Sequence, residues 1–355
     1  MDTPVLLYGA NGFTGTLIAH LAVQRGLRPI LAGRNAAQLA ALAATLNLPY
    51  QVCPLEDAPA LDRALHAVDV VLHCAGPFLH TWRPMVEACL RTGTHYLDLT
   101  GELPVYAALA ARDAHAKAAG VMLLPGVGFD VVPTDCLAAH LKRRLPSATH
   151  LTLAFWQAGP ARPSRGTATT AVESVLPVGT TVRRNGQLAT LPHASQARLI
   201  DFGPARRKAT LFPWGDVFMA FYSTGIPNIE DYAVLDPTLG PLLTAARYLR
   251  PVFGWSLVRN ALKRAIRSRP AGPSAAQRAA TRTHVWGEVR DAQGRTAVAR
   301  LHGPEARYTW APRTALAVVQ QVLAGVAPPG FQTPALAYGP DFVLGDADVT
   351  REDLA

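Results

Sequence analysis

Three glycines near the start of the chain have a spacing that could place a phosphate against the backbone. In the stretch LLYGANGFTGTLI, Gly9, Gly12 and Gly15 separate a predicted buried strand over Val5–Tyr8 from a predicted helix over Phe13–Arg25. Gly9 would make the tight turn, Gly12 would let backbone N–H groups approach a pyrophosphate, and Gly15 would allow close packing of the helix. The helix N-terminus adds a partial positive charge. The spacing is GxxGxxG rather than GxGxxG, so a plain glycine-rich turn stays an alternative.

The residues after the second predicted strand indicate which dinucleotide would bind. This strand, Pro29–Ala32, is followed by Gly33, Arg34 and Asn35. An NAD enzyme would carry Asp or Glu at about the position of Arg34, to bind the ribose hydroxyls. A guanidinium there favours the 2′-phosphate of NADP instead. We therefore predict NADP(H) as the cofactor.

The first 130 residues alternate predicted strands and helices, and each strand ends at a polar or glycine-rich corner. In a parallel sheet these corners meet at one edge, where the ligand binds. We expect Gly76 and Pro77 beside the nicotinamide and Asp57 beside the adenine. One helix is predicted over Pro104–Ala119. The predicted cofactor-binding residues are Gly9, Asn11, Gly12, Phe13, Thr14, Gly15, Gly33, Arg34, Asn35, Asp57, Ala75, Gly76, Pro77 and Phe78.

Hydride transfer from such a cofactor often needs one proton donor. The Tyr-x-x-x-Lys pair of short-chain dehydrogenases is absent, because none of the nine tyrosines has a lysine four residues later. The candidate catalytic residues are Asp130 and Tyr222, the latter at the end of a predicted strand over Val217–Tyr222; Glu102 and His80 are further candidates. The structural alternatives are a helix-capping Asp and a packed strand Tyr. Water could also supply the proton.

Positive charge is concentrated in one segment. The net charge is +9, and residues 239–282 hold nine Lys and Arg but neither Asp nor Glu. Because the excess is confined to this segment, we expect no nucleic-acid partner. Within it, a helix predicted over Trp255–Arg267 would have a basic and an apolar face. The basic face consists of Arg259, Lys263 and Arg267. The apolar face consists of Val258, Leu262, Ala265 and Ile266.

The basic face has three candidate partners and one plain alternative. It could bind an acidic acyl carrier protein, the phosphates of a CoA thioester, or an anionic membrane surface. The alternative is a solvated face on an arginine-rich protein. A homodimer is a further possibility.

The amino-acid composition is that of an ordinary globular protein. The 355 residues, 49% hydrophobic and 17% charged, suffice for two domains. The start lacks a signal-peptide pattern and no window has about 18 uninterrupted apolar residues, so we expect a cytoplasmic protein. The four cysteines form no CxxC pair and are expected to be buried free thiols. The histidines are scattered, so no metal site is expected.

Several motifs together resemble one family. In the first half they are YGANGFTG, LAGRN, CAGPF, YLDLTGE and PGVGFDVVPTD, and in the second FPWGDVFMAFYSTGIPNIEDY, WGEVRDAQGRT and GFQTPALAYGPDFVL. The combination resembles the saccharopine dehydrogenase-like oxidoreductases, including the trans-acting enoyl reductases. The resemblance implies an α/β fold, with an N-terminal Rossmann domain (doubly wound parallel sheet) that binds NADP and a second α+β domain whose sheet covers the nicotinamide. We place the first domain at 1–148, the second, for substrate and dimerisation, at 149–324, and a tail packing back on the body at 325–355.

The resemblance leaves three functions open. The first is an NADPH-dependent oxidoreductase that reduces an enoyl or related unsaturated acyl substrate. The second is an NADP-binding sensor or scaffold without turnover. The third is an amino-acid dehydrogenase of the saccharopine type, although no cationic cluster outside the basic segment is marked as a pocket for several carboxylates.

Overall fold

The computed structural model describes all residues except 1–4, 171, 173–178, 236–255, 269 and 355. Contacts divide the chain into two units. The first contains Met1–Asp130 and Arg307–Ala337, and the second contains Val131–Ala306 and Tyr338–Ala355. These boundaries differ from our sequence-based ones because a segment near the C-terminus returns to the first unit.

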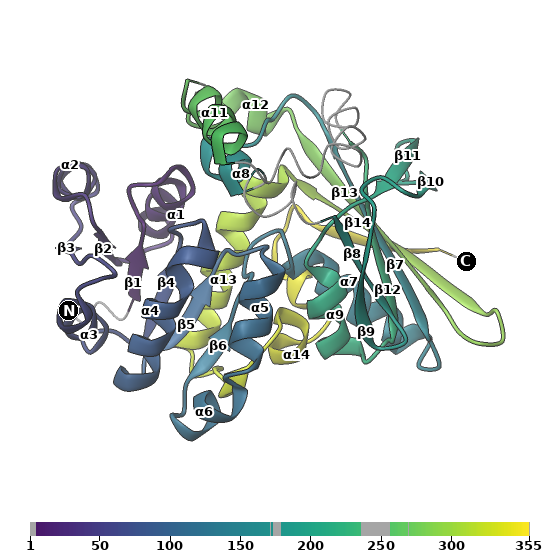
Figure 1. Ribbon diagram of the computed structural model, residues 1–355, viewed down its shortest axis with the longest axis horizontal. Helices are drawn as coiled ribbons and strands as arrows, with labels where there is room; N and C mark the ends of the chain where they lie inside the picture. The colour runs from purple at the N-terminus through teal and green to yellow at the C-terminus, as the bar shows by residue number, and fades with distance from the viewer. Residues whose placement is uncertain (1–4, 171, 173–178, 236–255, 269, 355) are drawn as a thin grey trace. The chain divides into compact units, whose positions relative to one another are not determined.

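The first unit is built on a seven-stranded sheet in which every pairing is parallel. Its strand order is β15-β6-β5-β4-β1-β2-β3 (Figure 1). The strands are β1 (Val5–Tyr8), β2 (Ile30–Gly33), β3 (Tyr50–Val52), β4 (Val70–His73), β5 (His95–Asp98), β6 (Met122–Leu124) and β15 (Gly330–Phe331). The order reverses at β1, where β4 lies on one side and β2 on the other. The predicted doubly wound parallel sheet is confirmed.

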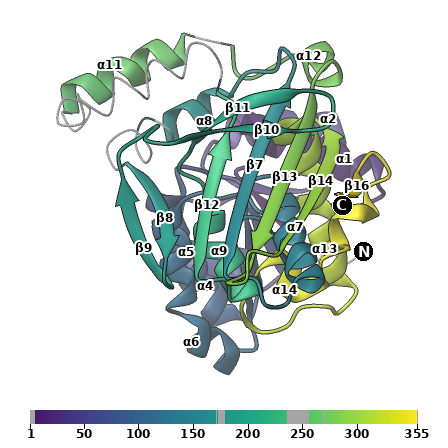
Figure 2. The same cartoon turned by 90° about the vertical axis from the view of Figure 1, so that its right-hand side faces the viewer.

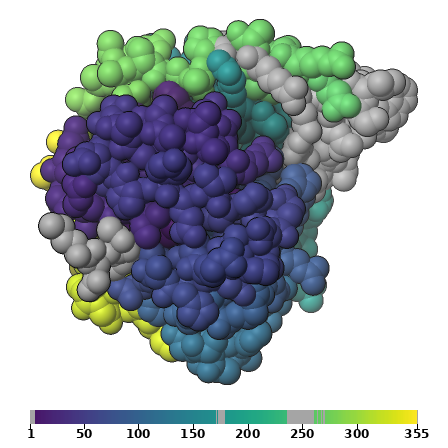
Figure 3. Space-filling model, turned by 90° about the vertical axis from the view of Figure 1, so that its left-hand side faces the viewer, coloured from purple at the N-terminus to yellow at the C-terminus, as the bar shows by residue number. Residues whose placement is uncertain are grey.

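Alternation along β1 shows that helices cover both faces of this sheet. Leu7 lines a small apolar cavity together with Ile18 and Leu316. Tyr8 points to the opposite face, where its ring lies 5.4 Å from that of His73. The helices of the first unit are α1 (Phe13–Gln24), α2 (Ala36–Leu46), α3 (Ala58–Leu65), α4 (Phe78–Thr92), α5 (Leu103–Ala110), α6 (Asp113–Ala118), α13 (Ala311–Leu323) and α14 (Pro334–Tyr338). Figure 3 shows the surface formed by the N-terminal residues of this unit, in purple and blue.

The helix that we predicted over Pro104–Ala119 is two helices, α5 and α6. The break falls at Arg112. Its guanidinium donates to the Ala108 carbonyl (3.0 Å), which lies in the last turn of α5, and to Glu87 (2.6 Å) on α4. These bonds satisfy the end of one helix and let the chain turn before the next begins.

Helix α13 belongs to the first unit, although we assigned its residues to the second domain. It packs against α1, and Thr314 donates to the Val127 carbonyl (3.0 Å) just beyond β6. The edge strand β15 then pairs with β6, Gly330 opposite Met122. The residues from Arg307 to Ala337 therefore complete the parallel sheet and its helical cover.

The second unit is built on a nine-stranded mixed sheet. Seven strands follow the order β10-β11-β12-β7-β13-β14-β16, and β8 pairs with both β12 and β9. The strands are β7 (His150–Ala158), β8 (Thr180–Arg184), β9 (Gln187–Leu191), β10 (Ala197–Asp201), β11 (Arg206–Leu211), β12 (Asn228–Ala233), β13 (Arg282–Arg290), β14 (Thr296–Pro304) and β16 (Thr350–Leu354). Strands β12, β7, β13 and β14 lie side by side in Figure 2, with only β12 and β7 parallel among them.

Helices α7 (Val132–Arg144) and α9 (Asp216–Thr224) of the second unit pack against each other. Thr134 donates to Asp216 (2.8 Å), and Ser223 donates to Asp135. The other helices are α8 (Arg165–Thr170), α11 (Ser256–Arg267) and α12 (Ala275–Ala279). The two buried Asp side chains thus join the VPTD motif to the FPWGDVFMAFYSTG motif.

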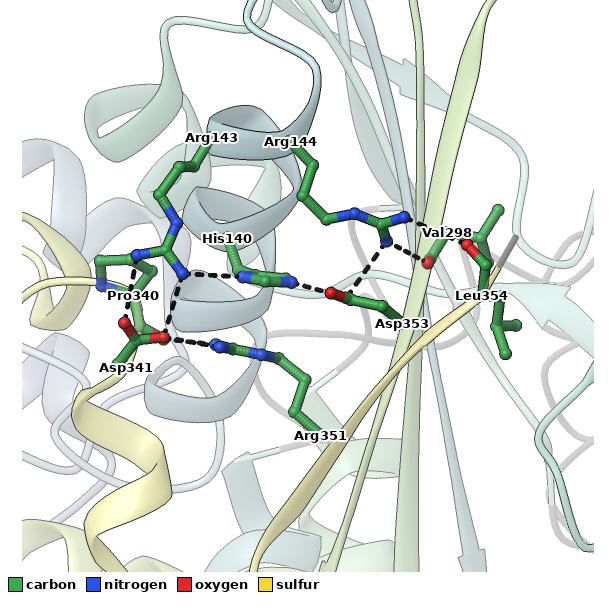
Figure 4. A network of polar contacts seen from close by, with 9 residues as sticks. All are labelled: His140, Arg143, Arg144, Val298, Pro340, Asp341, Arg351, Asp353 and Leu354. Carbon is green, nitrogen blue, oxygen red and sulfur yellow. Dashed lines mark hydrogen bonds and ion pairs between the residues drawn. The ribbon is translucent and has the colours of Figure 1, made fainter.

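The C-terminal residues of the second unit are held to α7 by a polar network (Figure 4). Asp353 on β16 contacts His140 (2.7 Å) and Arg144 (3.1 Å), while Asp341 contacts Arg143 (3.1 Å) and Arg351 (2.7 Å). Burial lowers the pKa of His140, and Asp353 acts in the opposite direction. The last residues therefore form an integral edge of this sheet.

Candidate dinucleotide and catalytic site

The three glycines of the first turn differ in what excludes a side chain. Gly9 has a φ of +79°, and a Cβ on it would lie 2.8 Å from the Ala75 nitrogen. A Cβ on Gly15 would overlap the Gly9 carbonyl oxygen and lie 2.9 Å from Ala10 Cα. Gly12 is exposed, and a Cβ on it would meet only the Gly9 oxygen, at 3.2 Å. Folding therefore requires Gly9 and Gly15, whereas Gly12 leaves open a surface that a ligand could approach.

Two helix N-termini follow the strands at the point where the strand order reverses. Helix α1 begins after Gly12, and no side chain in the described part of the chain caps it. Helix α4 begins after Pro77, and its first N–H groups donate to the Glu102 carboxylate, from Phe78 at 2.7 Å and from Leu79 at 2.9 Å. A protein carboxylate already satisfies α4, so α1 is the helix end suited to a phosphate.

The corners that follow β1 and β4 are held close together by backbone contacts. Cys74 donates its N–H to the Tyr8 carbonyl (2.8 Å), and Gly9 packs against Ala75. In open parallel sheets this reversal of strand order is where a dinucleotide binds. The predicted residues of the first turn and of the Ala75–Phe78 segment are brought together here. Phe78 itself is mostly buried, and its N–H is bonded to Glu102.

The β2 corner carries the cation that we predict to select NADP. Arg34 is exposed. Burial of Tyr8 raises the pKa of its hydroxyl, and the positive charge of Arg34 acts in the opposite direction. Asn35 caps α2 by accepting from the Gln38 N–H (3.1 Å), while the Gln38 side chain accepts from Asn11 (2.7 Å). Gln38 thus connects the glycine turn with the Arg34 corner. Sequence reasoning missed it, because a Gln in a helical first turn carries no distinguishing signal.

Asp57 stands exposed after β3, where we predicted it beside the adenine. Its carboxylate accepts from the Ala60 N–H (3.0 Å) and so caps α3. This capping role does not depend on a ligand.

The end of β5 is organised by a buried carboxylate that sequence reasoning did not select. Asp98 accepts from the backbone N–H groups of Thr100 and Gly126, both at 2.9 Å, and from the Tyr96 hydroxyl at 2.7 Å. Burial raises the pKa of Asp98 to about 6, while the two backbone hydrogen bonds act in the opposite direction. Asp98 therefore holds the β5 and β6 corners together, and the segment leading to Asp130 starts from a fixed point. The sequence signal that could have identified Asp98 is its position in the YLDLTGE motif.

Asp130, our first candidate proton donor, ends this segment. A Cβ on Gly101 would lie 2.8 Å from Asp130 Oδ2, so the half-buried carboxyl packs against the backbone of the β5 corner. Burial raises the pKa of Asp130 to about 6, and the Arg307 guanidinium acts in the opposite direction. A carboxyl group that titrates near neutral pH is suited to proton transfer.

Tyr222, our second candidate, lies on a helix rather than on the strand that we predicted. The segment Val217–Tyr222 falls within α9, which starts after Gly215 and ends at Gly225 with a φ of +66°. The run VFMAFY favoured a strand, but it forms a helix in which Val217 to Ala220 are all buried. Tyr222 is 44% exposed, and its ring lies 5.2 Å from that of Phe218. Tyr222 and Asp130 belong to different units.

The two further candidate proton donors are Glu102 and His80. Glu102 is buried and accepts the two N–H groups of α4. His80 is exposed on the first turn of the same helix. Within the described ranges, no group of three or more His, Cys, Asp or Glu side chains is arranged to hold a metal ion. The four cysteines are free thiols, as predicted; three are buried and Cys74 is partly exposed.

The predicted basic helix exists as α11, and Ile266 on its apolar face is buried against Val172. Leu262 packs against the same cluster, but Ala265 is exposed rather than part of that face. The other positions that we predicted there, on both faces, have side chains outside the described residues: Val258, Arg259, Lys263 and Arg267. In the part of the chain that the structure describes, no helix is long and apolar enough to cross a membrane.

The strand order, the glycine turn and the uncapped α1 define a Rossmann domain of the dinucleotide-binding class. Residues 5–124 match the family model described as the saccharopine dehydrogenase NADP binding domain. The match confirms the NADP-binding domain that the motifs predicted for this part of the chain.

Known relatives extend this comparison. Two proteins named trans-acting enoyl reductase, from Mycobacterium leprae and Mycobacterium ulcerans, are 39% and 34% identical over 149 residues. The matches cover 40% and 39% of this chain, and 36% and 35% of the relatives. The matched region thus spans about a third of each relative's length.

One solved structure is similar over the whole chain. It is apo histidine-tagged saccharopine dehydrogenase (L-Glu forming) from Saccharomyces cerevisiae, with a TM-score of 0.66, 14% identity and 99% coverage of both chains. At this identity the likeness shows the fold alone. The α/β fold with a second, mixed-sheet unit is confirmed.

Proposed function

We propose that this chain is an NADPH-dependent oxidoreductase that reduces an enoyl or related unsaturated acyl substrate. The observation that carries the proposal is the glycine turn followed by the uncapped α1, within residues that match an NADP-binding family model. The similarity to proteins named trans-acting enoyl reductase supports the enoyl substrate.

The described residues suggest how the cofactor is held. The α1 N-terminus and the Gly12 backbone accommodate the pyrophosphate, Arg34 pairs with the 2′-phosphate, and the Ala75–Pro77 backbone borders the nicotinamide. NADPH supplies a hydride when it is bound. The chain itself holds the acceptor carbon near the hydride donor and keeps the site dry. Covering of the nicotinamide by the second sheet stays a prediction.

Asp130 is the proposed proton donor. Reduction of an enoyl thioester adds a hydride to the β-carbon and a proton to the α-carbon. With its pKa raised to about 6, Asp130 holds a proton in part of the molecules at neutral pH and can transfer it as hydride addition proceeds. Tyr222 is kept as a second proposed site residue, because its exposed position on α9 leaves it accessible to a ligand.

The partner that we propose is an acidic carrier protein presenting the acyl thioester, bound by Arg259, Lys263 and Arg267. The charge pattern of the sequence supports it, since residues 239–282 contain no acidic residue. A CoA thioester would meet the same cations through its phosphates.

The test combines binding with turnover. Calorimetry should show stoichiometric binding of NADPH and weaker binding of NADH. NADPH oxidation should then occur with an enoyl thioester and not with keto or imine substrates. Binding without any oxidation would instead support the sensor or scaffold. Oxidation only with lysine-pathway substrates would support an amino-acid dehydrogenase, and absence of binding would overturn the proposal.

A further inference from the structure

A buried histidine lies directly beneath the loop that we propose borders the nicotinamide. His73 ends β4 and has no exposed surface. Its ring lies 5.4 Å from that of Tyr8, 5.3 Å from that of Phe78 and 6.2 Å from that of Tyr96. This aromatic surrounding disfavours a charged imidazole, and burial lowers the pKa of His73 to about 3. The ring is therefore neutral, with one N–H donor and one acceptor.

The contact between His73 and Thr81 shows which nitrogen carries the proton. Thr81 Oγ1 lies 2.7 Å from the Ala75 carbonyl oxygen and 3.0 Å from His73 Nε2. Carbonyl oxygens can only accept, so the single hydroxyl hydrogen of Thr81 points to the Ala75 carbonyl, which is nearer than the Pro77 carbonyl at 3.4 Å. His73 Nε2 must then donate to Thr81. His73 Nδ1 is left as an acceptor with no partner among the described residues.

An unpartnered buried nitrogen calls for an explanation. A Phe or Leu would fill the same aromatic surrounding without an orphaned acceptor. What His73 adds is the Nε2–H bond, which fixes the rotation of the Thr81 hydroxyl. The hydroxyl in turn fixes the Ala75 carbonyl. On its other side Ala75 packs against Gly9, so its peptide is held between the phosphate turn and the first turn of α4.

We propose that His73 and Thr81 are positioning residues, which hold the Ala75 peptide so that the nicotinamide end of the cofactor binds in one defined place. The inference rests on the proposed function for the location of the nicotinamide. It assigns no contact with the cofactor to either side chain. Both act through the Ala75 backbone, and neither affects the adenosine end directly.

Thr81→Val tests the proposal, because it keeps the shape of the side chain and removes the hydrogen bonds of the hydroxyl. Thr81→Ser keeps the hydroxyl. Thr92→Val is the matched control, since Thr92 is a partly buried residue of the same helix whose hydroxyl donates to the Ala88 carbonyl (3.0 Å) near the other end. His73→Phe keeps the ring and removes the Nε2 donor, and serves if Thr81→Val does not fold. Circular dichroism checks folding.

The readout compares two ligands that share the adenosine end. We expect Thr81→Val to weaken NADPH binding about 3- to 10-fold, the change that one hydrogen bond is worth, and to move the fluorescence of bound NADPH toward that of free NADPH. The Kd of adenosine 2′,5′-bisphosphate, which lacks the nicotinamide, should stay within about 2-fold. Thr81→Ser and Thr92→Val should behave like the unmodified protein.

Three outcomes would count against the proposal. If a folded Thr81→Val or His73→Phe protein binds NADPH with unchanged affinity and fluorescence, the positioning role is wrong. If adenosine 2′,5′-bisphosphate loses affinity to the same extent as NADPH, the residues have a general structural role instead. If the unmodified protein binds adenosine 2′,5′-bisphosphate but not NADPH, the placement of the nicotinamide is wrong, whereas failure to bind either overturns the proposed function itself.

Discussion

The Glu102 carboxylate and the Phe78 N–H group, 24 residues apart in sequence, form a 2.7 Å hydrogen bond at the start of α4. A second bond joins the carboxylate to the Leu79 N–H at 2.9 Å. The Glu102 carboxylate therefore occupies the N-terminus of α4, one of the two helix N-termini that follow β1 and β4. This leaves α1 as the end that attracts a phosphate, and it gives the proposed cofactor a direction along the sheet.

Replacing Glu102 by Gln should destabilise the first unit. The amide keeps the size of the side chain but offers one acceptor oxygen to two N–H donors, so one buried N–H loses its partner. We expect the free energy of unfolding to fall by about 1–3 kcal/mol, measured by urea denaturation. Glu87→Gln is the control, because its ion pair with Arg112 is partly exposed and should contribute about 0–1 kcal/mol. Equal losses in both variants would contradict the capping role.

Substitution of the turn glycines by Ala should separate folding from binding. Gly15→Ala places a methyl group on the Gly9 carbonyl and should destabilise the fold. Gly12→Ala brings a methyl group to 3.2 Å from that oxygen, a tight contact but not an overlap, so thermal stability should fall less than in Gly15→Ala while NADPH affinity falls. Gly345→Ala, with no atom within 4 Å of its Cβ, is the control. Unchanged NADPH affinity in Gly12→Ala would place the phosphate elsewhere.

Arg34→Ala should alter the choice between the two dinucleotides. A charge-assisted hydrogen bond to phosphate contributes about 1.5–3 kcal/mol, so we expect NADPH affinity to fall roughly 10- to 100-fold. NADH affinity should change little, because NADH has no 2′-phosphate. Titration calorimetry with both ligands gives the ratio, and Arg83→Ala, an exposed position on α4, is the control. An equal loss of affinity for both ligands would show that Arg34 does not bind the 2′-phosphate.

Asp130 should give the reaction a pH dependence of known sign. A general acid acts in its protonated form, so with a pKa of about 6 the rate should fall as pH rises through 6. Asp130→Asn should lower the rate and abolish this decline. Since the folded-state pKa is raised above the ordinary 3.8, the folded state binds more protons and the free energy of unfolding falls as pH rises from about 4 to 6.

The same substitution therefore makes a second, independent measurement possible. Asn has no charge to bury, so Asp130→Asn should be more stable than the unmodified protein at pH 7, while being less active. Denaturation curves at pH 4 and pH 7 provide the comparison. A variant that keeps the pH-dependent rate would show that another group, or water, donates the proton.

Reversing the charge of the proposed partner surface should act on the substrate and not on the cofactor. In the triple variant Arg259→Glu, Lys263→Glu, Arg267→Glu, the KM for a carrier-bound enoyl thioester should rise, and the NADPH affinity should stay the same. The effect should weaken at high salt, because salt screens the attraction between opposite charges on two molecules. The same substrate on a short pantetheine arm is the control. Unchanged KM for both substrates would remove this helix from substrate binding.

Local signals explain why the first domain was predictable. The turn from Gly9 to Gly15 was recognisable because its glycine spacing lies within a few neighbouring positions, although the atoms that exclude a side chain at Gly9 belong to Ala75. The cation at Arg34 has a position set by the length of one strand-helix-strand unit.

Other features depend on contacts that no local pattern encodes. The segment around Tyr222 is apolar enough to form either a strand or a helix. It forms a helix because α9 packs against α7. Helix α13 returns to the first unit after almost the whole second one, and the pattern of its apolar residues does not indicate which unit it packs against. Glu102 accepts from backbone N–H groups of α4, and His73 contacts the Thr81 side chain on the same helix. Both contacts form only in the folded chain.

The amino-acid sequence by itself thus determined the glycine turn, the parallel alternation of strands and helices and the charge at the β2 corner, because each follows from the preferences of adjacent residues. Only the tertiary structure decided which helix end stays open for a phosphate, which carboxylates become buried and titrate near neutral pH, and which side chains hold the Ala75 peptide. Those properties arise from desolvation and from hydrogen bonding between distant segments. Both require that these segments have come into contact in the folded chain.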